Sequence, residues 1–330
     1  MDISIAALAG GAFGSLAANL GLERLAKRLG WYDPPGKLKI HTKPVALTGG
    51  AGVLVGLLLV LAVLAIAGFA GSTVRAIAAA STLAFVLGFW DDRRWKLSSV
   101  AGPKLVLQAA AAAAMALALH FAGVRPALPT FVALGLGAGY FVCAMNALNL
   151  EDGMDGLAAG EAAISCLGFA WVLAGTGRLD CALLGLGGAA ALAGFLVMNW
   201  HPAKVFLGDA GSHLAGALAA GLALAVIGAV GPRAIPATVL IVGLPVVGTA
   251  WVIVRRLSKW AGSVLREKQF LRREAKGEWR IWHRVGAGDR EHLYDIVHSS
   301  GVSTRRTVLL FWLVQAVMAA AGVLWLERMR

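Results

Sequence analysis

The chain has 330 residues, of which 58% are hydrophobic and only 15% charged, and its formal net charge is +12 at pH 7. Runs of about 20 apolar residues are typical of membrane spans, so this composition excludes an ordinary soluble domain. The positive charge does not require a nucleic acid partner, because anionic lipid and a phosphate-bearing substrate account for it and no nucleic-acid-binding motif is visible.

The hydropathy pattern predicts an all-α integral membrane protein, with a single polytopic domain over residues 1–330. About ten spans are expected, at 3–23, 49–71, 73–90, 103–123, 128–150, 156–176, 180–199, 210–230, 234–256 and 305–326. No basic segment precedes the first span, and Arg24, Lys27 and Arg28 follow it. This order predicts a retained span and not a cleaved signal peptide.

The distribution of basic residues predicts the orientation. Of the 30 Lys and Arg residues, 24 lie in segments that follow odd-numbered spans and six lie at the opposite face. The positive-inside rule therefore places both termini outside and the opposite face, with its functional cleft, in the cytoplasm. For a bacterial chain this is the inner membrane.

The first segment between spans is rich in Lys, Pro and Gly and contains Lys39 and His41. Such a loop suits an anionic substrate and equally suits a basic loop that faces lipid. We take Lys39 and His41 as candidate substrate-binding residues.

The third predicted span ends in Asp91 and Asp92. Two carboxylates at the C-terminal end of a helix face the negative end of its dipole, which is unfavourable unless a cation neutralises them. Pairing with the following basic residues is the simpler explanation for an isolated pair. Because two other acidic clusters share this face, we favour a functional role.

Polar residues recur every third position at the end of the fifth span, at Asn146, Asn149, Asp152 and Asp155. This spacing keeps the first three on one side of a helix, and the glycines at 153 and 156 let the backbone turn. A capped polar turn would explain Asp155 but not the asparagines before it. The pattern predicts one lip of a polar cleft.

The segment between the seventh and eighth spans contains Asn199, Lys204, Phe206 and Asp209. Asp209 begins a helix, where a carboxylate is favoured and backbone N–H groups can meet phosphate, although an ordinary N-cap is an alternative. Phe206 offers an aromatic face to a flat ring. His213, one turn further, is expected to be a packed core residue.

The region 257–304 is predicted to be a long basic cytoplasmic loop that lies along the membrane surface. It ends near His292, a candidate substrate-binding residue.

Asp and Asn without nearby Cys or dense His select a hard cation, which indicates Mg²⁺, with Mn²⁺ as the alternative. Such an ion, together with lysines, would reduce the repulsion between two phosphates during phosphoryl transfer. A cleft that opens both to lipid and to the cytoplasm would admit one soluble nucleotide substrate and one lipid phosphate.

Taken together, four stretches within residues 30–216 resemble the polyprenyl-phosphate N-acetylhexosamine-1-phosphate transferase superfamily, the WecA and MraY type. They are Asp33-Pro34 through Lys39 and His41 to Gly49-Gly50, Gly88-Phe-x-Asp91-Asp92 with Lys104, Asn149-x-x-Asp152-Gly-x-Asp155, and Asn199-x-x-Pro-Ala-Lys204-x-Phe206-x-Gly208-Asp209. The resemblance implies transfer of a sugar 1-phosphate from a UDP-sugar to undecaprenyl phosphate with release of UMP. The lipid bilayer is then a partner, and a homodimer is a compatible assembly.

The resemblance also implies roles for individual residues. Asp209 resembles the principal Mg²⁺ ligand, with Asp92 as a further metal candidate, and Asp91 resembles the residue that deprotonates or positions the lipid phosphate. Lys39 and Lys104 would hold phosphate. The nucleotide-binding and metal-proximal wall would comprise Asn149, Asp152, Asp155, Asn199 and Phe206, the last stacking on uracil.

The chain departs from the family pattern in two places. Family members usually carry an Asp in the ninth span, where this chain has Gly248. Their last cytoplasmic loop is rich in His, whereas this chain keeps His292 and has Tyr294 and Asp295 where further histidines are usual. In the family the choice of sugar is attributed to this loop, so the resemblance implies that the region 257–304 recognises the sugar.

Two alternatives stay open, and a third does not fit the sequence. A phospho-N-acetylmuramoyl-pentapeptide transferase lies within the same superfamily. A transporter would place ionisable residues near the bilayer midplane, where this chain has only Glu161. A CDP-alcohol phosphatidyltransferase would need an Arg soon after the Asp-Gly pair, and none is present.

Overall fold

The structure is a computed structural model that describes residues 2–35, 43–95, 101–266 and 292–329. The candidate residues Lys39 and His41 lie outside the described residues, as does most of the basic region between 257 and 304. The ends of that region are helical: α10 continues to Arg266, and the short helix α13 begins at Leu293.

The described chain is almost entirely helical. Its elements are α1 (Ile3–Leu29), β1 (Tyr32–Asp33), β2 (Val45–Ala46), α2 (Gly49–Ile66), α3 (Ser72–Trp90), the π-helical turn η1 (Asp91–Trp95), α4 (Ala101–Phe121), α5 (Thr130–Glu151), α6 (Leu157–Gly175), α7 (Leu179–Asn199), α8 (Gly208–Val230), the 3-10 turn η2 (Pro232–Ala234), α9 (Ile235–Val242), α10 (Leu244–Arg266), α13 (Leu293–Ser299) and α14 (Thr304–Arg328).

Nine helices of the described chain are long and apolar enough to cross a membrane, and a bent pair makes up to ten. The prediction of an all-α polytopic bundle with about ten spans is therefore confirmed. The ninth predicted span, 234–256, is not a single straight helix. That span is broken into two helical segments, Pro232–Val242 and Leu244–Lys259, which meet at an angle of 82°.

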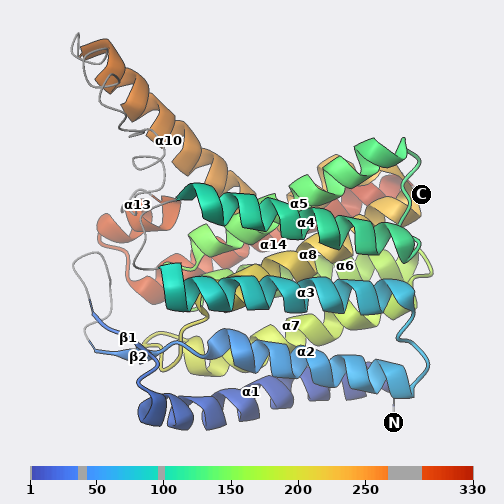
Figure 1. Cartoon of the computed structure of the whole chain (residues 1–330), viewed down its shortest axis with the longest axis horizontal. Helices are drawn as coiled ribbons and strands as arrows, with labels where there is room; N and C mark the ends of the chain where they lie inside the picture. Colours follow the sequence, from blue (N-terminus) through green and yellow to red (C-terminus); the bar gives the residue numbers. More distant parts are fainter. Residues whose placement is uncertain (1, 36–42, 96–100, 267–291, 330) are drawn as a thin grey trace.

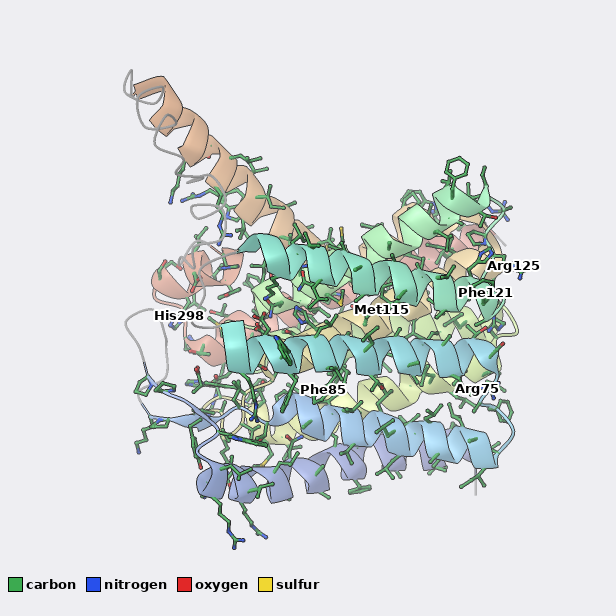
Figure 2. All side chains as sticks on the ribbon, viewed as in Figure 1. Arg75, Phe85, Met115, Phe121, Arg125 and His298 are labelled. Atoms are coloured by element: carbon green, nitrogen blue, oxygen red, sulfur yellow. The ribbon has the colours of Figure 1, made fainter. Side chains whose placement is uncertain are left out.

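The chain termini and the small sheet lie at opposite ends of the bundle. In Figure 1, α1 begins and α14 ends at the right-hand end, while β1, β2 and α13 lie at the left-hand end. Arg75 and Arg125 lie at the right-hand end and His298 at the left-hand end (Figure 2). Both termini are thus on the same side of the bundle, opposite the loops that carry the acidic motifs.

Helix α8 forms the centre of the bundle and packs against α3, α5 and α6. Nearly all of its side chains are buried, and most are Ala, Gly or Leu. Small residues let neighbouring backbones approach closely, which is how helices associate within a membrane. The outer faces of α1, α2, α4 and α14 instead expose large apolar side chains that suit contact with lipid.

The break between α9 and α10 is stabilised by one buried side chain. Gly243 has a positive φ of 58°, and the backbone N–H of Leu244 donates to Oε1 of Gln315 on α14 at 2.8 Å. Nε2 of Gln315 donates to the carbonyl of Ile241 at 2.9 Å and to Oγ of Ser165 at 3.0 Å. Backbone groups freed by a break inside a membrane need such partners.

We expect Gln315→Leu to destabilise the protein, because the N–H of Leu244 and the carbonyl of Ile241 would lose buried hydrogen bonds. Each lost partner costs about 1–3 kcal/mol. Thermal unfolding in detergent should therefore show a clearly lower Tm. The matched control is Val317→Leu, which changes a 61% exposed side chain on the same helix. Equal Tm values for the two variants would contradict this role for Gln315.

A small sheet connects two distant loops at the left-hand end of the bundle. Strands β1 and β2 pair antiparallel, with Tyr32 opposite Ala46, and Ala46 also bridges to Val205. The N–H of Phe206 donates to the carbonyl of Ala46 at 2.8 Å. The first loop thereby fixes the segment that leads into α8.

Candidate active site

Close contact between α3 and α8 brings two acidic motifs together. A Cβ on Gly88 would lie 2.1 Å from the carbonyl oxygen of Asp209, so only glycine allows this approach. The carboxylate of Asp92 then accepts hydrogen bonds from the N–H groups of Asp209, at 3.2 Å, and Ala210, at 3.0 Å. Asp92 therefore satisfies two of the free N–H groups at the start of α8.

Lys104 of α4 lies between two carboxylates. Its Nζ contacts Oδ2 of Asp91 and lies 3.4 Å from Oδ2 of Asp209. The carboxyl groups of Asp91 and Asp209 therefore face the same ammonium group. Like charges this close need a cation or a shared proton between them, and Lys104 supplies part of that compensation.

Asn149 connects α5 to the same cluster. Its Nδ2 donates to Oδ1 of Asp209 at 2.8 Å and to Oγ of Ser212 at 3.0 Å. Asp152 follows one turn later, near Asp209 and Asp92. Its burial first, and then these two neighbouring carboxylates, raise the pKa of Asp152 well above its usual range, whereas the N–H of Gly208 opposes this rise.

A buried polar chain lies beneath Lys104. Nδ2 of Asn146 donates to Oε1 of Gln108 at 3.1 Å, and Nε2 of Gln108 lies 3.1 Å from Nε2 of His213. His213 is buried, as expected for a packed core residue, and it also belongs to this hydrogen-bond network. Sequence reasoning missed Gln108, although its place one turn after Lys104 on the same helix was a usable signal.

Asp155 and Asn199 contact the loop that precedes α8. Oδ2 of Asp155 lies 2.7 Å from Nδ1 of His201 and accepts a hydrogen bond from the N–H of Ala203 at 3.1 Å. Asn199 is buried, and its side chain accepts from the N–H of Gly156 and donates to the carbonyl of Val205. In this structure both side chains are engaged in shaping the loop.

The remaining candidates border this region. Lys204 is exposed, and Phe206 is half-buried with its carbonyl accepting from the N–H of Gly49. His292 is buried at the start of α13, with its ring stacked on that of Tyr294 at 5.1 Å between centroids. The hydroxyl of Tyr294 donates to the carbonyl of Leu150 at 3.3 Å, so α13 contacts the turn after α5.

The donor set fits a hard divalent cation. Four carboxylates, of Asp91, Asp92, Asp152 and Asp209, lie near one another with Lys104 beside them. Among the described residues, no three His, Cys, Asp or Glu side chains are grouped as ligands of one ion. Mg²⁺ commonly takes only one or two carboxylates and completes its shell with water and substrate phosphate, so this arrangement suits it.

Comparison with known proteins gives a consistent result. The family model described as glycosyl transferase family 4 matches residues 74–227. A probable undecaprenyl-phosphate N-acetylglucosaminyl 1-phosphate transferase of Bacillus subtilis (strain 168) is 29% identical, over 93% of this chain and 82% of the relative.

Two phospho-N-acetylmuramoyl-pentapeptide-transferases are also similar. That of Synechococcus sp. (strain RCC307) is 35% identical over 73% of this chain and 66% of the relative. That of Geobacillus sp. (strain WCH70) is 32% identical over 72% of this chain and 70% of the relative.

Proposed function

Because the chain belongs to glycosyl transferase family 4, we propose that it transfers an N-acetylhexosamine 1-phosphate from a UDP-sugar to undecaprenyl phosphate and releases UMP. The relative from Bacillus subtilis, which matches over 93% of this chain, supports this choice of sugar and lipid. The product would be a polyprenyl-diphosphate sugar, the first lipid-linked intermediate of a cell-envelope glycan.

One observation carries the proposal. Asp91, Lys104 and Asp209 come from three helices and meet at one point, directly at the N-terminal end of α8. A lysine between two carboxylates can exchange one of these contacts for an ion pair with an incoming phosphate. Membership of a transferase family does not support the transporter alternative.

We infer a direct displacement. An oxygen of the lipid phosphate attacks the phosphorus that carries the sugar, the bond from that phosphorus to the bridging oxygen breaks, and UMP leaves with that oxygen. Asp91 positions the lipid phosphate or accepts its proton. Two unit charges at 4 Å repel by about 4 kcal/mol at an effective dielectric of 20, so Lys104 is needed to bring the two phosphates together.

A bound Mg²⁺ would withdraw negative charge from the diphosphate and so stabilise the leaving UMP. Asp209 is its principal proposed ligand, with Asp92 as the second candidate. Asp209 keeps its carboxylate oriented by the hydrogen bond from Asn149.

The nucleotide would occupy the wall formed by Asn149, Asp152 and Phe206, with the ring of Phe206 against uracil. His292 would contact the sugar or the diphosphate from α13. The predominance of basic residues at this end of the bundle supports a site that faces the cytoplasm.

A phospho-N-acetylmuramoyl-pentapeptide transferase is the second candidate, because relatives with that name share 32–35% identity with this chain. The two functions use the same lipid phosphate and differ in the sugar and its peptide. A substrate panel therefore separates them.

The test is UMP release by the purified protein in nanodiscs with undecaprenyl phosphate and Mg²⁺. UDP-N-acetylglucosamine, UDP-N-acetylgalactosamine and UDP-N-acetylmuramoyl-pentapeptide are compared, each with and without the lipid. We expect lipid-dependent UMP release from a UDP-N-acetylhexosamine. Release only from the pentapeptide substrate would favour the second candidate, and no release from any of them would contradict the reaction.

We expect chelation with EDTA to abolish UMP release, and added Mg²⁺ to restore it, because the acidic cluster would repel the substrate phosphates without the ion. Mn²⁺ should restore activity in part, and Ca²⁺ poorly, because octahedral coordination at short range suits the first two ions. Full activity after thorough chelation would exclude the metal from the reaction.

A further inference from the structure

A second buried acidic group lies beside the candidate active site. Glu151 is the last residue of α5, directly before Asp152, and only 1% of its surface is exposed. Neither of its carboxylate oxygens has a hydrogen-bond partner among the described residues. A buried polar group without a partner is costly, so the position calls for an explanation.

The space for this carboxylate is provided by Gly248 on α10. A Cβ on Gly248 would lie 2.0 Å from Oε1 of Glu151, so the glutamate occupies the volume that a side chain at position 248 would need. Gly248 is one of the positions at which this chain departs from the usual family pattern. The carboxylate therefore reaches the interface between α5 and α10 from the α5 side.

The surroundings place Glu151 on the side of the site that α13 covers. The hydroxyl of Tyr294 donates to the carbonyl of Leu150, and a Cβ on Gly153 would lie 2.0 Å from that hydroxyl oxygen. Burial, and then the carboxylates of Asp295 and Glu151, raise the pKa of Tyr294 well above its usual range. Its hydroxyl therefore remains a hydrogen-bond donor to Leu150 at physiological pH.

The chemistry of the position restricts the ligand. A buried carboxyl group next to Asp152 and near Asp295 suits neutral hydrogen-bonding groups of a ligand better than its phosphates. The donor substrate of the proposed function brings such groups in its sugar hydroxyls and acetamido N–H, and also in its ribose hydroxyls and uracil N–H.

We propose that Glu151 is a further substrate-binding residue, whose carboxyl group, held against Gly248, accepts hydrogen bonds from hydroxyl or amide N–H groups of the donor substrate. This inference rests on the proposed function. It assigns to Glu151, on α5, a recognition role beside the catalytic cluster.

The experiment measures kcat and KM for the UDP-sugar that the wild-type protein uses, and the inhibition constant of UMP. We expect Glu151→Ala to raise KM by about tenfold to 100-fold with little change in kcat, since a buried hydrogen bond is lost from ground state and transition state alike. An unchanged inhibition constant for UMP would assign the contact to the sugar. A parallel increase would assign it to the nucleoside.

An exchange variant separates binding from mere packing. Gly248→Asp alone should be strongly impaired, because its Cβ would overlap Glu151. The double variant Glu151→Ala with Gly248→Asp brings a carboxyl group into the same space from α10, and we expect its KM to return most of the way from the value in Glu151→Ala to the wild-type value. If Glu151 had a purely structural role, the double variant would regain the wild-type Tm but not the wild-type KM.

The matched control is Glu161→Gln, which alters a second fully buried glutamate that has no hydrogen-bond partner among the described residues. It should leave KM within about twofold of wild type. An unchanged KM and UMP inhibition constant in Glu151→Ala would overturn the inference while leaving the proposed function intact. A wild-type protein inactive with every UDP-sugar would instead contradict the proposed function.

Discussion

Asp209→Asn should reduce UMP release by about 10³-fold while the protein remains folded, as expected for the loss of a charge that stabilises the transition state. The carboxylate of Asp209 contacts Lys104 and accepts from Asn149. Asparagine keeps an oxygen for the Asn149 hydrogen bond but loses the negative charge. The substitution therefore removes the proposed metal ligand with little effect on packing.

The matched control is Asp180→Asn, which changes an Asp in the first turn of a different helix, α7. That carboxylate pairs with Arg178 at 3.2 Å. Surface pairs of this kind contribute about 0–1 kcal/mol, so activity should stay close to wild type. Turnover in Asp209→Asn comparable with that of Asp180→Asn would remove Asp209 from the reaction.

Gly88→Ala is expected to lower activity by about 10²-fold, because a displacement of about 1 Å at a catalytic group can have an effect of this size. The new methyl group would lie 2.1 Å from the carbonyl oxygen of Asp209 and 2.6 Å from the N of Ala210. These are backbone atoms of a buried helix, so α3 must move instead. Asp91 and Asp92, one turn further along, would then move away from Asp209 and Lys104.

The control for Gly88→Ala is Gly139→Ala on α5, where an added Cβ has no atom within 4 Å. Both changes improve helix propensity by about 1 kcal/mol, so a difference between them reports the contact between α3 and α8. Overpacking at Gly88 should also lower Tm, since it costs about 1–3 kcal/mol. Normal activity in Gly88→Ala would show that the spacing of these helices is not needed.

Several features of the site were predictable from local sequence. The apolar runs predicted the spans, because only helices satisfy their backbone groups within lipid over such lengths. Since spans alternate in direction, the acidic motifs that follow odd-numbered spans had to lie at one end of the bundle. The expectation that Asp91, Asp92, Asn149 and Asp209 share a site followed from this alternation.

The broken ninth span was not predictable in the same way. The segment around Gly243 is apolar throughout, and hydropathy does not distinguish a straight helix from two helices at 82°. The bend depends on Gln315, which is distant in sequence and supplies the hydrogen bonds at the break. No local pattern indicates that partner.

Features that depend on local sequence could be predicted, whereas contacts between residues far apart in the chain could not. Composition and spacing alone determined the helical membrane class and the common end of the acidic motifs, because these depend on hydropathy and on the alternating direction of the spans. Only the tertiary structure placed Lys104 between Asp91 and Asp209, engaged Asp155 with His201, and set Glu151 against Gly248. Each of these contacts joins different helices or loops, and their packing distances are decided by side chains far apart in the chain.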